Sequence, residues 1–282
     1  MNKKESLLDK SLLIPFGILT AISIVFIYSS SSVVADADFG NQYFYLQRQL
    51  VALSIGLFAG TIFLFVPISF YRENGLLLIL ISAFLLSLVF IPGIGVEKNG
   101  SLRWINIGFN IQPSEIAKIF VPIYLCGYCL KRKDQLENSW WGFIKPLILT
   151  SIISILLLLE MDLGATVVIF AIGILILFIG GAKFNQLLIL FLVFISIVIL
   201  IAYFNEERWS RVVSFSNPWD DVGGTDYQLI NALVASVQGG FSGLGIGEST
   251  QKYYFLPESH TDFIFSIFVE ETGVIGMTLL FS

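Results

Sequence analysis

The chain has 282 residues, of which 56% are hydrophobic and 13% are charged, and its mean hydropathy is +0.83. These values lie far outside the range of soluble globular proteins and predict a polytopic membrane protein. The formal net charge of -5 therefore says little about partners, and the lack of a long basic run or a zinc-type Cys/His cluster argues against nucleic acid as a partner.

Long apolar stretches without charged residues predict the transmembrane helices. Three of them, residues 11–35, 49–71 and 74–96, are each long enough for a membrane span of about 20 residues. Four further spans are expected over residues 116–130, 146–159, 163–182 and 184–205, and an eighth helix begins near Asp262. We therefore expect an all-α polytopic membrane protein with seven complete transmembrane helices and most of an eighth. The first stretch is too long for the apolar region of a cleaved signal, so it should act as an uncleaved anchor.

Basic residues in the loops predict the orientation in the membrane. Cytoplasmic loops carry an excess of Lys and Arg, which places the amino terminus in the cytoplasm. The loops then alternate, with nine cations inside and seven outside. The inner cations are Lys3, Lys4, Lys10, Arg72, Lys131, Arg132, Lys133, Lys145 and Lys183, and the outer cations are Arg48, Lys98, Arg103, Lys118, Arg208, Arg211 and Lys252. The bias is weak, and the number of external cations predicts a negatively charged external ligand.

One connection is much longer than the others. Residues 205–261 form a predicted extracytoplasmic loop between the seventh and eighth helices, and loops of this length usually have a function. Its glycine-rich run, residues 239–247, superficially matches a nucleotide-binding fingerprint, but no βαβ pattern surrounds it. We predict a tight, re-entrant backbone that approaches either a helix or a ligand.

The end of this loop carries the strongest candidate for chemistry. Residues 256–262 read Leu-Pro-Glu-Ser-His-Thr-Asp and lead into an apolar stretch, which places Asp262 and the single histidine, His260, at the mouth of a membrane helix. An ionisable group at such a boundary can be tuned for proton transfer, so Asp262 is the predicted catalytic base. Glu258 is an alternative base, although it precedes the helix and should be more solvated. Glu270 and Glu271, about two turns further on, are expected to make polar contacts within the bundle.

A second group of polar residues opens the fourth helix. Pro113 and Glu115 are typical of a helix start, and Glu115 and Lys118 share one helix face. The two charges could simply neutralise each other at the membrane surface, but ionisable pairs at membrane depth usually line a polar cavity. Cys126 and Cys129 form a CxxC inside an apolar helix, where thiols usually act as small buried hydrophobes rather than as redox groups or metal ligands.

These motifs resemble one known family. Residues 112–118 (Gln-Pro-Ser-Glu-Ile-Ala-Lys), 162–164 (Asp-Leu-Gly) and 256–263, followed by Glu270 and Glu271, are similar to motifs of the shape, elongation, division and sporulation family, represented by FtsW, RodA and SpoVE. The resemblance extends from about residue 45 to residue 276. Residues 99–104 and 217–220 are more similar to the division branch, FtsW. The family commonly has proline where this chain has Met161, and the lack of proline is expected to loosen the turn before Asp162.

The resemblance implies a peptidoglycan glycosyltransferase that polymerises lipid II at the outer face of the bacterial cytoplasmic membrane. The implied partners are lipid II, a class B penicillin-binding protein, other divisome membrane proteins and membrane lipids. The family has ten transmembrane helices, so residues 1–282 would be a single transmembrane domain without the last two. Asp162 belongs to the implied site, and His260 is expected to orient the loop rather than to transfer a proton.

The residues suit this implied reaction. A base must deprotonate the acceptor hydroxyl, and cations must hold the pyrophosphate of the leaving group. Asp262 can serve as the base, and an electrophilic clamp of Arg48, Arg103 and Lys118 falls near the predicted outer surface. The supporting polar network comprises Glu115, Asp162, Glu258 and His260. The expected path is a single inverting displacement that releases undecaprenyl pyrophosphate. A divalent cation, Mg²⁺ or Mn²⁺, could share the charge, although no residue pattern forms a recognisable metal site.

Two other functions remain open. The same cations could carry a lipid-linked precursor across the bilayer, as a lipid II flippase would. A flippase needs access from both faces, however, and the motif charges cluster on the predicted outer half. The chain could also be a non-catalytic divisome scaffold that positions a penicillin-binding protein.

Overall fold

The computed structural model describes residues 9–98, 101–106, 110–204, 209–210, 219, 224 and 226–282. The chain folds into two compact units, and each is described by itself. Met1–Phe65 and Ile201–Ser282 form the first unit, and Val66–Leu200 forms the second. Some residues named above lie outside the described ranges: Lys3, Lys4, Asn99, Gly100, Arg208, Arg211, residues 217–218 and Asp220.

Among the described residues, six helices are long and apolar enough to cross a membrane. They are α1 (Lys10–Phe39), α2 (Phe44–Phe65), α3 (Ile68–Leu88), α6 (Trp140–Leu159), α8 (Phe184–Tyr203) and α11 (Ile264–Phe281). A further apolar helix, α7 (Leu163–Ile179), is shorter, with 17 residues. Large apolar side chains such as Phe58 and Ile179 are exposed on these helices, as lipid-facing residues are. The chain is therefore an all-α polytopic membrane protein, as its composition predicts.

The boundary between the second and third predicted spans was wrong. Pro67 stands between α2 and α3 and is the N-cap residue of α3, with backbone angles of the extended region. Proline lacks the N–H that a continuous helix would need at this point, so the helix ends before it and a new one begins after it. Tyr71 consequently lies in α3, and α3 ends at Leu88 rather than near residue 96.

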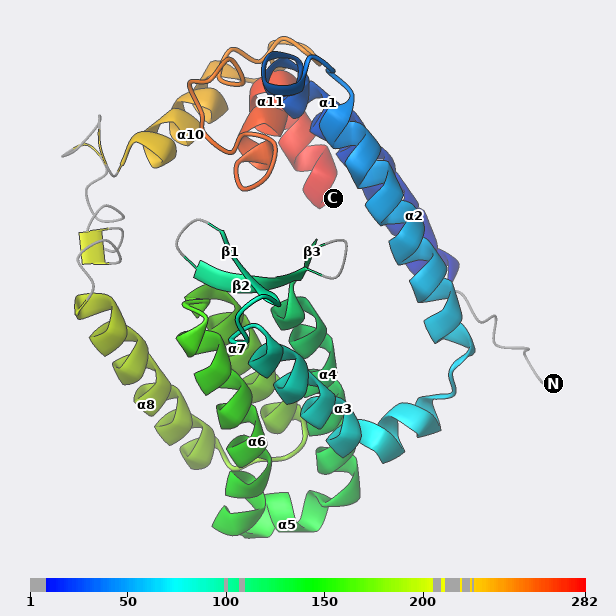
Figure 1. The fold of residues 1–282 in the computed structure, drawn as a ribbon, viewed down its shortest axis with the longest axis vertical. Coiled ribbons are helices and arrows are strands. Elements are labelled where there is room, and N and C mark those ends of the chain that lie inside the picture. The colour runs from blue at the N-terminus through cyan, green and yellow to red at the C-terminus, as the bar shows by residue number, and fades with distance from the viewer. Residues whose placement is uncertain are drawn as a thin grey trace. The chain divides into compact units, whose positions relative to one another are not determined.

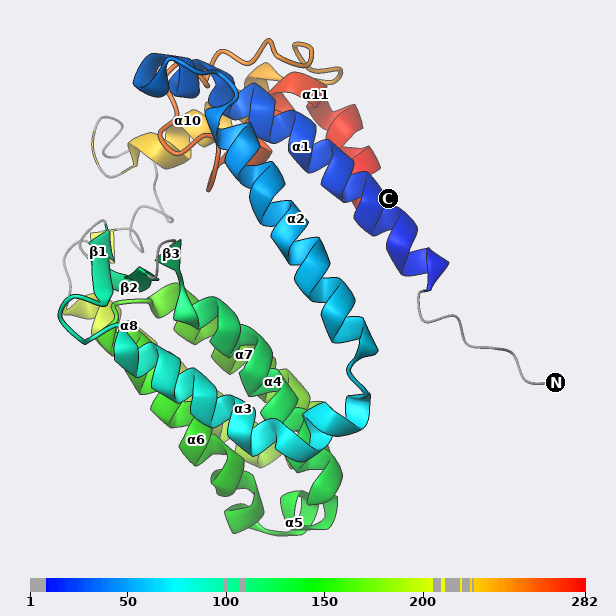
Figure 2. The ribbon, with the colours of Figure 1, turned by 45° about the vertical axis from the view of Figure 1, so that its right-hand side comes forward.

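The second unit is a helical bundle with a small sheet at one end (Figure 1). Helices α3, α4 (Pro113–Lys131), α6 and α7 run alongside one another, and the short helix α5 (Lys133–Asn138) lies at the end remote from the sheet (Figure 2). Their core is built from buried apolar side chains, among them Leu86, Leu125, Leu157 and Leu177. Helix α8 joins this bundle through the stacked rings of Phe170 and Phe194, whose centroids are 3.6 Å apart.

The sheet was not predicted. Strands β1 (Gly95–Lys98), β2 (Ser101–Asn106) and β3 (Asn110–Ile111) are antiparallel neighbours in the order β1-β2-β3. The sequence between β1 and β2 is Asn-Gly, the strongest short signal for a hairpin. The sheet leads directly into Pro113, the first residue of α4, and so fixes where this helix begins.

The first unit is built from α1, α2, α10 (Tyr227–Gln238) and α11. Asp9 caps α1 by accepting a hydrogen bond from Ser11 N at 2.9 Å, and Gly40 ends it in the left-handed conformation. Helices α1 and α2 lie side by side (Figures 1 and 2), and Phe26 of α1 meets Phe268 of α11 edge to face at 4.7 Å. Helix α10 falls within the predicted loop of residues 205–261 and packs against α11.

The glycine-rich run binds the backbone of α11. Gly273 has a positive φ of 67°, which interrupts this helix. The carbonyls of Glu270 and Glu271 accept from Leu244 N and Gly245 N, each at 3.0 Å, while Val274 N and Ile275 N donate to the carbonyls of Gly240 and Phe241. In a regular helix these four groups of α11 would pair with one another, so the run replaces the lost helical hydrogen bonds. The structure confirms that the run approaches a helix.

Two adjacent carboxylates of α11, Glu270 and Glu271, connect this helix to the segment after the glycine-rich run and to α1. Glu270 accepts from Ser249 Oγ at 2.5 Å and from Thr250 N at 2.9 Å, and Glu271 accepts from Ser29 Oγ of α1 at 2.6 Å. Lys252 Nζ lies 3.4 Å from Glu271 Oε1, and both side chains are buried. The expected polar contacts within the bundle are therefore present. Lys252, one of the predicted external cations, is neutralised by Glu271.

Replacing glycines in this run tests the close backbone approach. Gly243 and Gly240 both have positive φ values, 80° and 53°, but a Cβ on Gly243 would lie 2.2 Å from Glu271 O, whereas a Cβ on Gly240 would meet nothing within 4 Å. We expect Gly240→Ala to lower the free energy of unfolding by about 1–2 kcal/mol through backbone strain. Gly243→Ala should add an overpacking loss of about 1–3 kcal/mol. Thermal unfolding in detergent measures both variants, and equal losses would contradict the packing described here.

Candidate functional site

Two of the predicted site residues line one pocket in the first unit. A cavity of about 330 Å³ is bounded by side chains of α1, α2 and the segment before α11, including Tyr45, Arg48, His260 and Thr261. Arg48 and His260 are more than 200 residues apart in sequence, and the packing of the unit brings them to the same cavity. The structure therefore brings together one residue of the predicted clamp and one of the predicted supporting network.

Aromatic contacts hold the side chains of His260 and Arg48 in place. The ring of His260 lies against that of Tyr45, with centroids 4.3 Å apart. The Arg48 guanidinium lies over the Phe44 ring at 5.4 Å, and no carboxylate pairs with it among the described residues. A guanidinium without a carboxylate partner, beside a cavity, is available to bind phosphate oxygens.

Asp262 follows directly after the pocket-lining residue Thr261. It is exposed, two residues before the first residue of α11, and within the described part of the chain its carboxylate accepts no hydrogen bond. This carboxylate is thus open to an incoming hydroxyl group. The structure places it at the mouth of a membrane helix, as the sequence predicted.

Glu258 shapes the turn that presents Asp262. Its φ is 53°, its carbonyl accepts from Thr261 N at 3.1 Å and Phe263 N at 3.2 Å, and its carboxylate accepts from Thr261 Oγ1 at 2.8 Å. The side chain is exposed, as expected from its place before the helix. Ser259 is buried and donates to the carbonyl of Ser30 at 3.4 Å, which ties the same turn to α1.

A second polar cluster lies in the second unit, where the sheet meets the turn between α6 and α7. Asp162 is the N-cap residue of α7 and accepts from Ala165 N at 3.0 Å, while its other oxygen accepts from Gln112 Nε2 at 3.3 Å. Arg103 of β2 donates from Nη2 to the carbonyl of Met161 at 2.8 Å. The predicted residues Arg103 and Asp162 therefore lie on either side of one turn.

Backbone hydrogen bonds close the turn at Met161, where the family commonly has proline. Met161 N donates to Leu158 O at 3.1 Å, and Asp162 N donates to Leu157 O at 2.9 Å, so the turn is closed by backbone hydrogen bonds. Met161 reaches this geometry with a φ of 61°, in the left-handed region that non-glycine residues rarely adopt. The Arg103 contact to its carbonyl adds a further constraint on the turn.

Glu160 belongs to this cluster and was missed by the sequence analysis. Its side chain is 0% exposed, and neither carboxylate oxygen has a hydrogen-bond partner among the described residues. Burial raises the pKa of Glu160, the nearby charge of Asp162 acts in the same direction and Arg103 acts in the opposite direction, which together bring the pKa to about 8. The carboxyl group is therefore largely protonated at neutral pH. In the sequence, Glu160 could have been identified from its position at the end of an apolar run, two residues before Asp162.

Glu115 and Lys118 form the predicted pair at the start of α4. Lys118 Nζ donates to Glu115 Oε1 at 2.6 Å, and the Glu115 side chain is 60% exposed. Pro113 occupies the first turn of the helix, as predicted. Because Lys118 already has a close carboxylate partner, it is less available to a pyrophosphate than the sequence analysis assumed.

The described residues do not suit a protein-bound divalent cation. Within the described ranges no group of three or more His, Cys, Asp and Glu side chains could hold a metal ion. The nearest arrangement, Glu160 with Asp162, has the Arg103 guanidinium beside it, and Asp162 already caps α7. The Arg103 guanidinium competes with a metal ion for the charge of Asp162, and the largely protonated Glu160 is a poor metal ligand. No resident metal is assigned to either cluster.

The chain is similar to known proteins over nearly its whole length. The model of the FtsW, RodA and SpoVE family, described as cell cycle proteins, matches residues 9–282. A probable peptidoglycan glycosyltransferase FtsW of Pseudomonas fluorescens is 42% identical over 259 residues, which cover 92% of this chain and 64% of the relative. A protein of the same description from Saccharophagus degradans is 40% identical over 274 residues, with coverages of 97% and 71%. The chain thus spans about two thirds of the length of these curated relatives.

Two solved structures share the fold. A chain of a peptidoglycan synthase complex, whose structure concerns the coordination of polymerization and crosslinking, superposes with a TM-score of 0.72 at 26% identity over 97% of this chain and 74% of that chain. The rod shape determining protein RodA of Thermus thermophilus superposes with a TM-score of 0.66 at 22% identity over 97% of this chain and 70% of RodA. The RodA match supports the fold alone.

The pH dependence of the free energy of unfolding tests whether Glu160 is buried and protonated in the folded protein. The unfolded chain loses this proton near the ordinary pKa of 4.5, whereas the folded chain keeps it to about pH 8. The Glu160 contribution to the free energy of unfolding therefore falls by about 1.4 kcal/mol per pH unit as the pH rises through this window. Glu160→Gln should remove this decline and should be more stable than the wild type at pH 8.

Thermal unfolding in detergent between pH 5 and pH 9 provides the measurement. Glu73→Gln, which neutralises a carboxylate that is 65% exposed in the same unit, should leave the pH dependence unchanged. An unaltered pH slope in Glu160→Gln would show that Glu160 is ionised in the folded protein, against the assignment made here.

Proposed function

Because the chain belongs to the FtsW, RodA and SpoVE family of cell cycle proteins, we propose that it is a peptidoglycan glycosyltransferase that polymerises lipid II during cell division. The relatives at about 40% identity are described as probable peptidoglycan glycosyltransferases FtsW. One structural observation carries the proposal: Arg48 and His260 line one cavity, and the unpaired carboxylate of Asp262 follows Thr261 at its edge.

In this mechanism Asp262 is the general base. Its exposed carboxylate accepts the proton of the acceptor sugar hydroxyl as that oxygen attacks the anomeric carbon of the donor. The bond from that carbon to the pyrophosphate oxygen breaks in the same step, so the configuration inverts and undecaprenyl pyrophosphate leaves. The turn built on Glu258 holds Asp262 in place, and His260, which lies against Tyr45, orients the same segment.

Arg48 is the proposed contact for the donor pyrophosphate within this pocket. A guanidinium can bind two phosphate oxygens at once and stabilises the negative charge that develops on the leaving group. Arg103 and Lys118 remain proposed pyrophosphate contacts. Each has a partner in the free protein, the Met161 carbonyl and Glu115 respectively, which a pyrophosphate would have to displace.

The setting of the enzyme is also proposed. Residues 1–282 would form one transmembrane domain, with α4 as a further span, seven complete helices and most of an eighth. Residues 205–261 would form its large extracytoplasmic region, with the amino terminus in the cytoplasm and the pocket facing outward. Partners would be a class B penicillin-binding protein and other divisome membrane proteins, in keeping with the similarity to a chain of a peptidoglycan synthase complex.

Substitution of the proposed base tests the enzyme assignment. Asp262→Asn keeps the size of the side chain but cannot accept the proton, so polymer formation should fall by at least about 100-fold. The assay uses purified lipid II, a class B penicillin-binding protein, and this chain both as it stands and extended with the carboxy-terminal part of the Pseudomonas fluorescens relative. Glu248→Gln, at an exposed carboxylate directly after the glycine-rich run, is the matched control and should retain activity.

The outcomes separate the competing functions. Undiminished polymer from Asp262→Asn would remove Asp262 from the mechanism. No polymer from either wild-type form, together with movement of fluorescent lipid II across vesicles, would favour a flippase. No polymer and no movement would favour a scaffold.

Substitution of Arg48 tests the pyrophosphate contact. Arg48→Gln removes a charge-assisted interaction and should lower kcat/KM for lipid II by about 10- to 100-fold. Arg48→Lys keeps the charge without the planar fork and should recover part of that loss. Steady-state kinetics with lipid II give these values, and an Arg48→Gln variant with wild-type kcat/KM would exclude Arg48 from substrate binding.

A further inference from the structure

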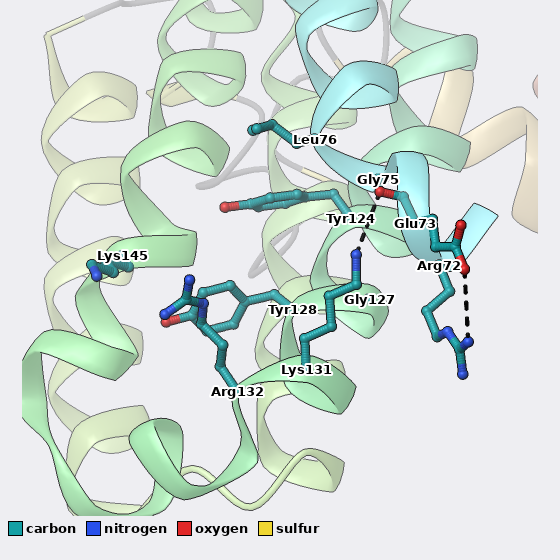
Figure 3. A pocket seen from close by; sticks show the side chains of 10 residues that line it. All are labelled: Arg72, Glu73, Gly75, Leu76, Tyr124, Gly127, Tyr128, Lys131, Arg132 and Lys145. Carbon is teal, nitrogen blue, oxygen red and sulfur yellow. Dashed lines mark hydrogen bonds and ion pairs between the residues drawn. The ribbon is translucent and has the colours of Figure 1, made fainter. Parts of the chain in front are cut away.

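A basic pocket lies at the end of the second unit remote from the sheet. The cavity, of about 360 Å³, lies between α3, α4 and α6 (Figure 3). Four cationic side chains line it, Arg72, Lys131, Arg132 and Lys145, and Glu73 is the one lining carboxylate. None of these residues belongs to the candidate site, because Arg72 and Lys131 lie at the opposite ends of α3 and α4 from the sheet.

Most of the positive charge of the pocket has no carboxylate partner among the described residues. Glu73 lies 4.0 Å from Arg72, at one edge of the pocket in Figure 3. Lys131 donates to the backbone carbonyl of Glu73 at 3.4 Å, and Arg132 donates to the side-chain oxygen of Gln135 at 3.0 Å. Among the described residues no carboxylate lies within ion-pair distance of Lys131, Arg132 or Lys145. An excess of three positive charges around one cavity favours an anionic ligand.

An apolar groove adjoins the basic pocket. This second cavity, of about 310 Å³, is lined by apolar side chains of α3 and α4, including Ile68, Pro122, Ile123 and Leu130. The two cavities share Arg72 and Gly127. A cationic cavity next to an apolar one matches a molecule with a charged head and a hydrocarbon chain, which a free phosphate ion lacks.

Aromatic residues place this end of the bundle at a membrane surface. Trp140 and Trp141, the first residues of α6, are 51% and 59% exposed, and Lys145 lies over the Trp141 ring at 5.9 Å. Exposed tryptophans at the end of a membrane helix are typical of the headgroup level. Basic pockets between transmembrane helices at that level bind anionic lipid headgroups.

We propose that the basic pocket and the adjoining groove bind an anionic phospholipid, with its phosphate among Lys131, Arg132 and Lys145 and an acyl chain along α3 and α4. The lipid would come from the leaflet that meets this end of the bundle. With a cytoplasmic amino terminus, this is the inner leaflet. The site is separate from the proposed catalytic pocket, so lipid binding does not depend on glycosyltransferase activity.

Native mass spectrometry of the full chain in detergent tests this site. The probes are phosphatidylglycerol and phosphatidylcholine with identical acyl chains, added at equal concentrations. We expect phosphatidylglycerol to bind preferentially. The double variant Arg132→Gln with Lys145→Gln should weaken its binding by about 30-fold, about fivefold for each charge, and should leave phosphatidylcholine binding unchanged.

Three comparisons keep the test decisive. Arg132→Lys with Lys145→Arg retains both charges and should keep the preference, which separates loss of charge from loss of folding. Lys133→Gln removes a neighbouring cation that pairs with Glu137 at 3.6 Å outside the pocket, and it should have no effect. Cys126→Trp fills the groove from an exposed position and should weaken phosphatidylglycerol binding without changing the charge.

Other results would overturn the proposal. Equal binding of the two phospholipids, or an unchanged preference in the double variant, would remove the basic pocket as the headgroup site. Displacement of phosphatidylglycerol by millimolar inorganic phosphate, with no effect of Cys126→Trp, would assign the pocket to a free anion. Tighter binding of undecaprenyl phosphate than of phosphatidylglycerol would assign it to a carrier lipid instead of a phospholipid.

Discussion

The first unit depends on the hydrogen bonds that join the backbone of α11 around Gly273 to the backbone of the glycine-rich run. A membrane helix normally satisfies every backbone group internally, because lipid offers no hydrogen-bond partners. In α11 the positive φ of Gly273 opens this pattern, and the glycine-rich run supplies the missing donors and acceptors. Side chains other than glycine would keep the two backbones apart at Gly239, Gly243 and Gly273, where an added Cβ would lie within 2.4 Å of a backbone atom.

These hydrogen bonds also set the position of the proposed catalytic segment. The chain leaves the glycine-rich run, passes the buried Lys252–Glu271 pair, and reaches the turn at Glu258 before it enters α11. Both ends of the intervening segment are therefore fixed to the same helix. Ser259, near its second end, binds Ser30 of α1, and Ser29 of α1 binds Glu271 of α11. Asp262 consequently sits on a well-anchored turn while its own carboxylate remains exposed. Such a combination holds a base in place without using its hydrogen-bonding capacity.

Among the described residues, hydropathy located the six helices that are long and apolar enough to cross a membrane, because such long apolar runs are stable in lipid. Hydropathy did not predict structure where a single proline or a turn sequence overrides the apolar composition. Pro67 interrupts an apolar run, and Asn99-Gly100 signals a hairpin inside a segment that was interpreted only as a loop. Arg48 and His260 were each assigned to the site from their chemistry and the family motifs, and the structure brings them to one cavity. The burial of Glu160 and the ion pair of Lys252 could not be predicted, since both depend on packing between segments.

Mapping where lipid II binds tests most directly whether the donor pyrophosphate and acceptor sugar meet at the pocket lined by Arg48 and His260. A photoreactive lipid II analogue would be activated on the chain in complex with a class B penicillin-binding protein, and the labelled peptides would be identified by mass spectrometry. We expect adducts on α2 around Tyr45 and Arg48 and on the segment before α11, reduced by competing unlabelled lipid II. Competable adducts confined to other segments, with none at either of these, would contradict this assignment.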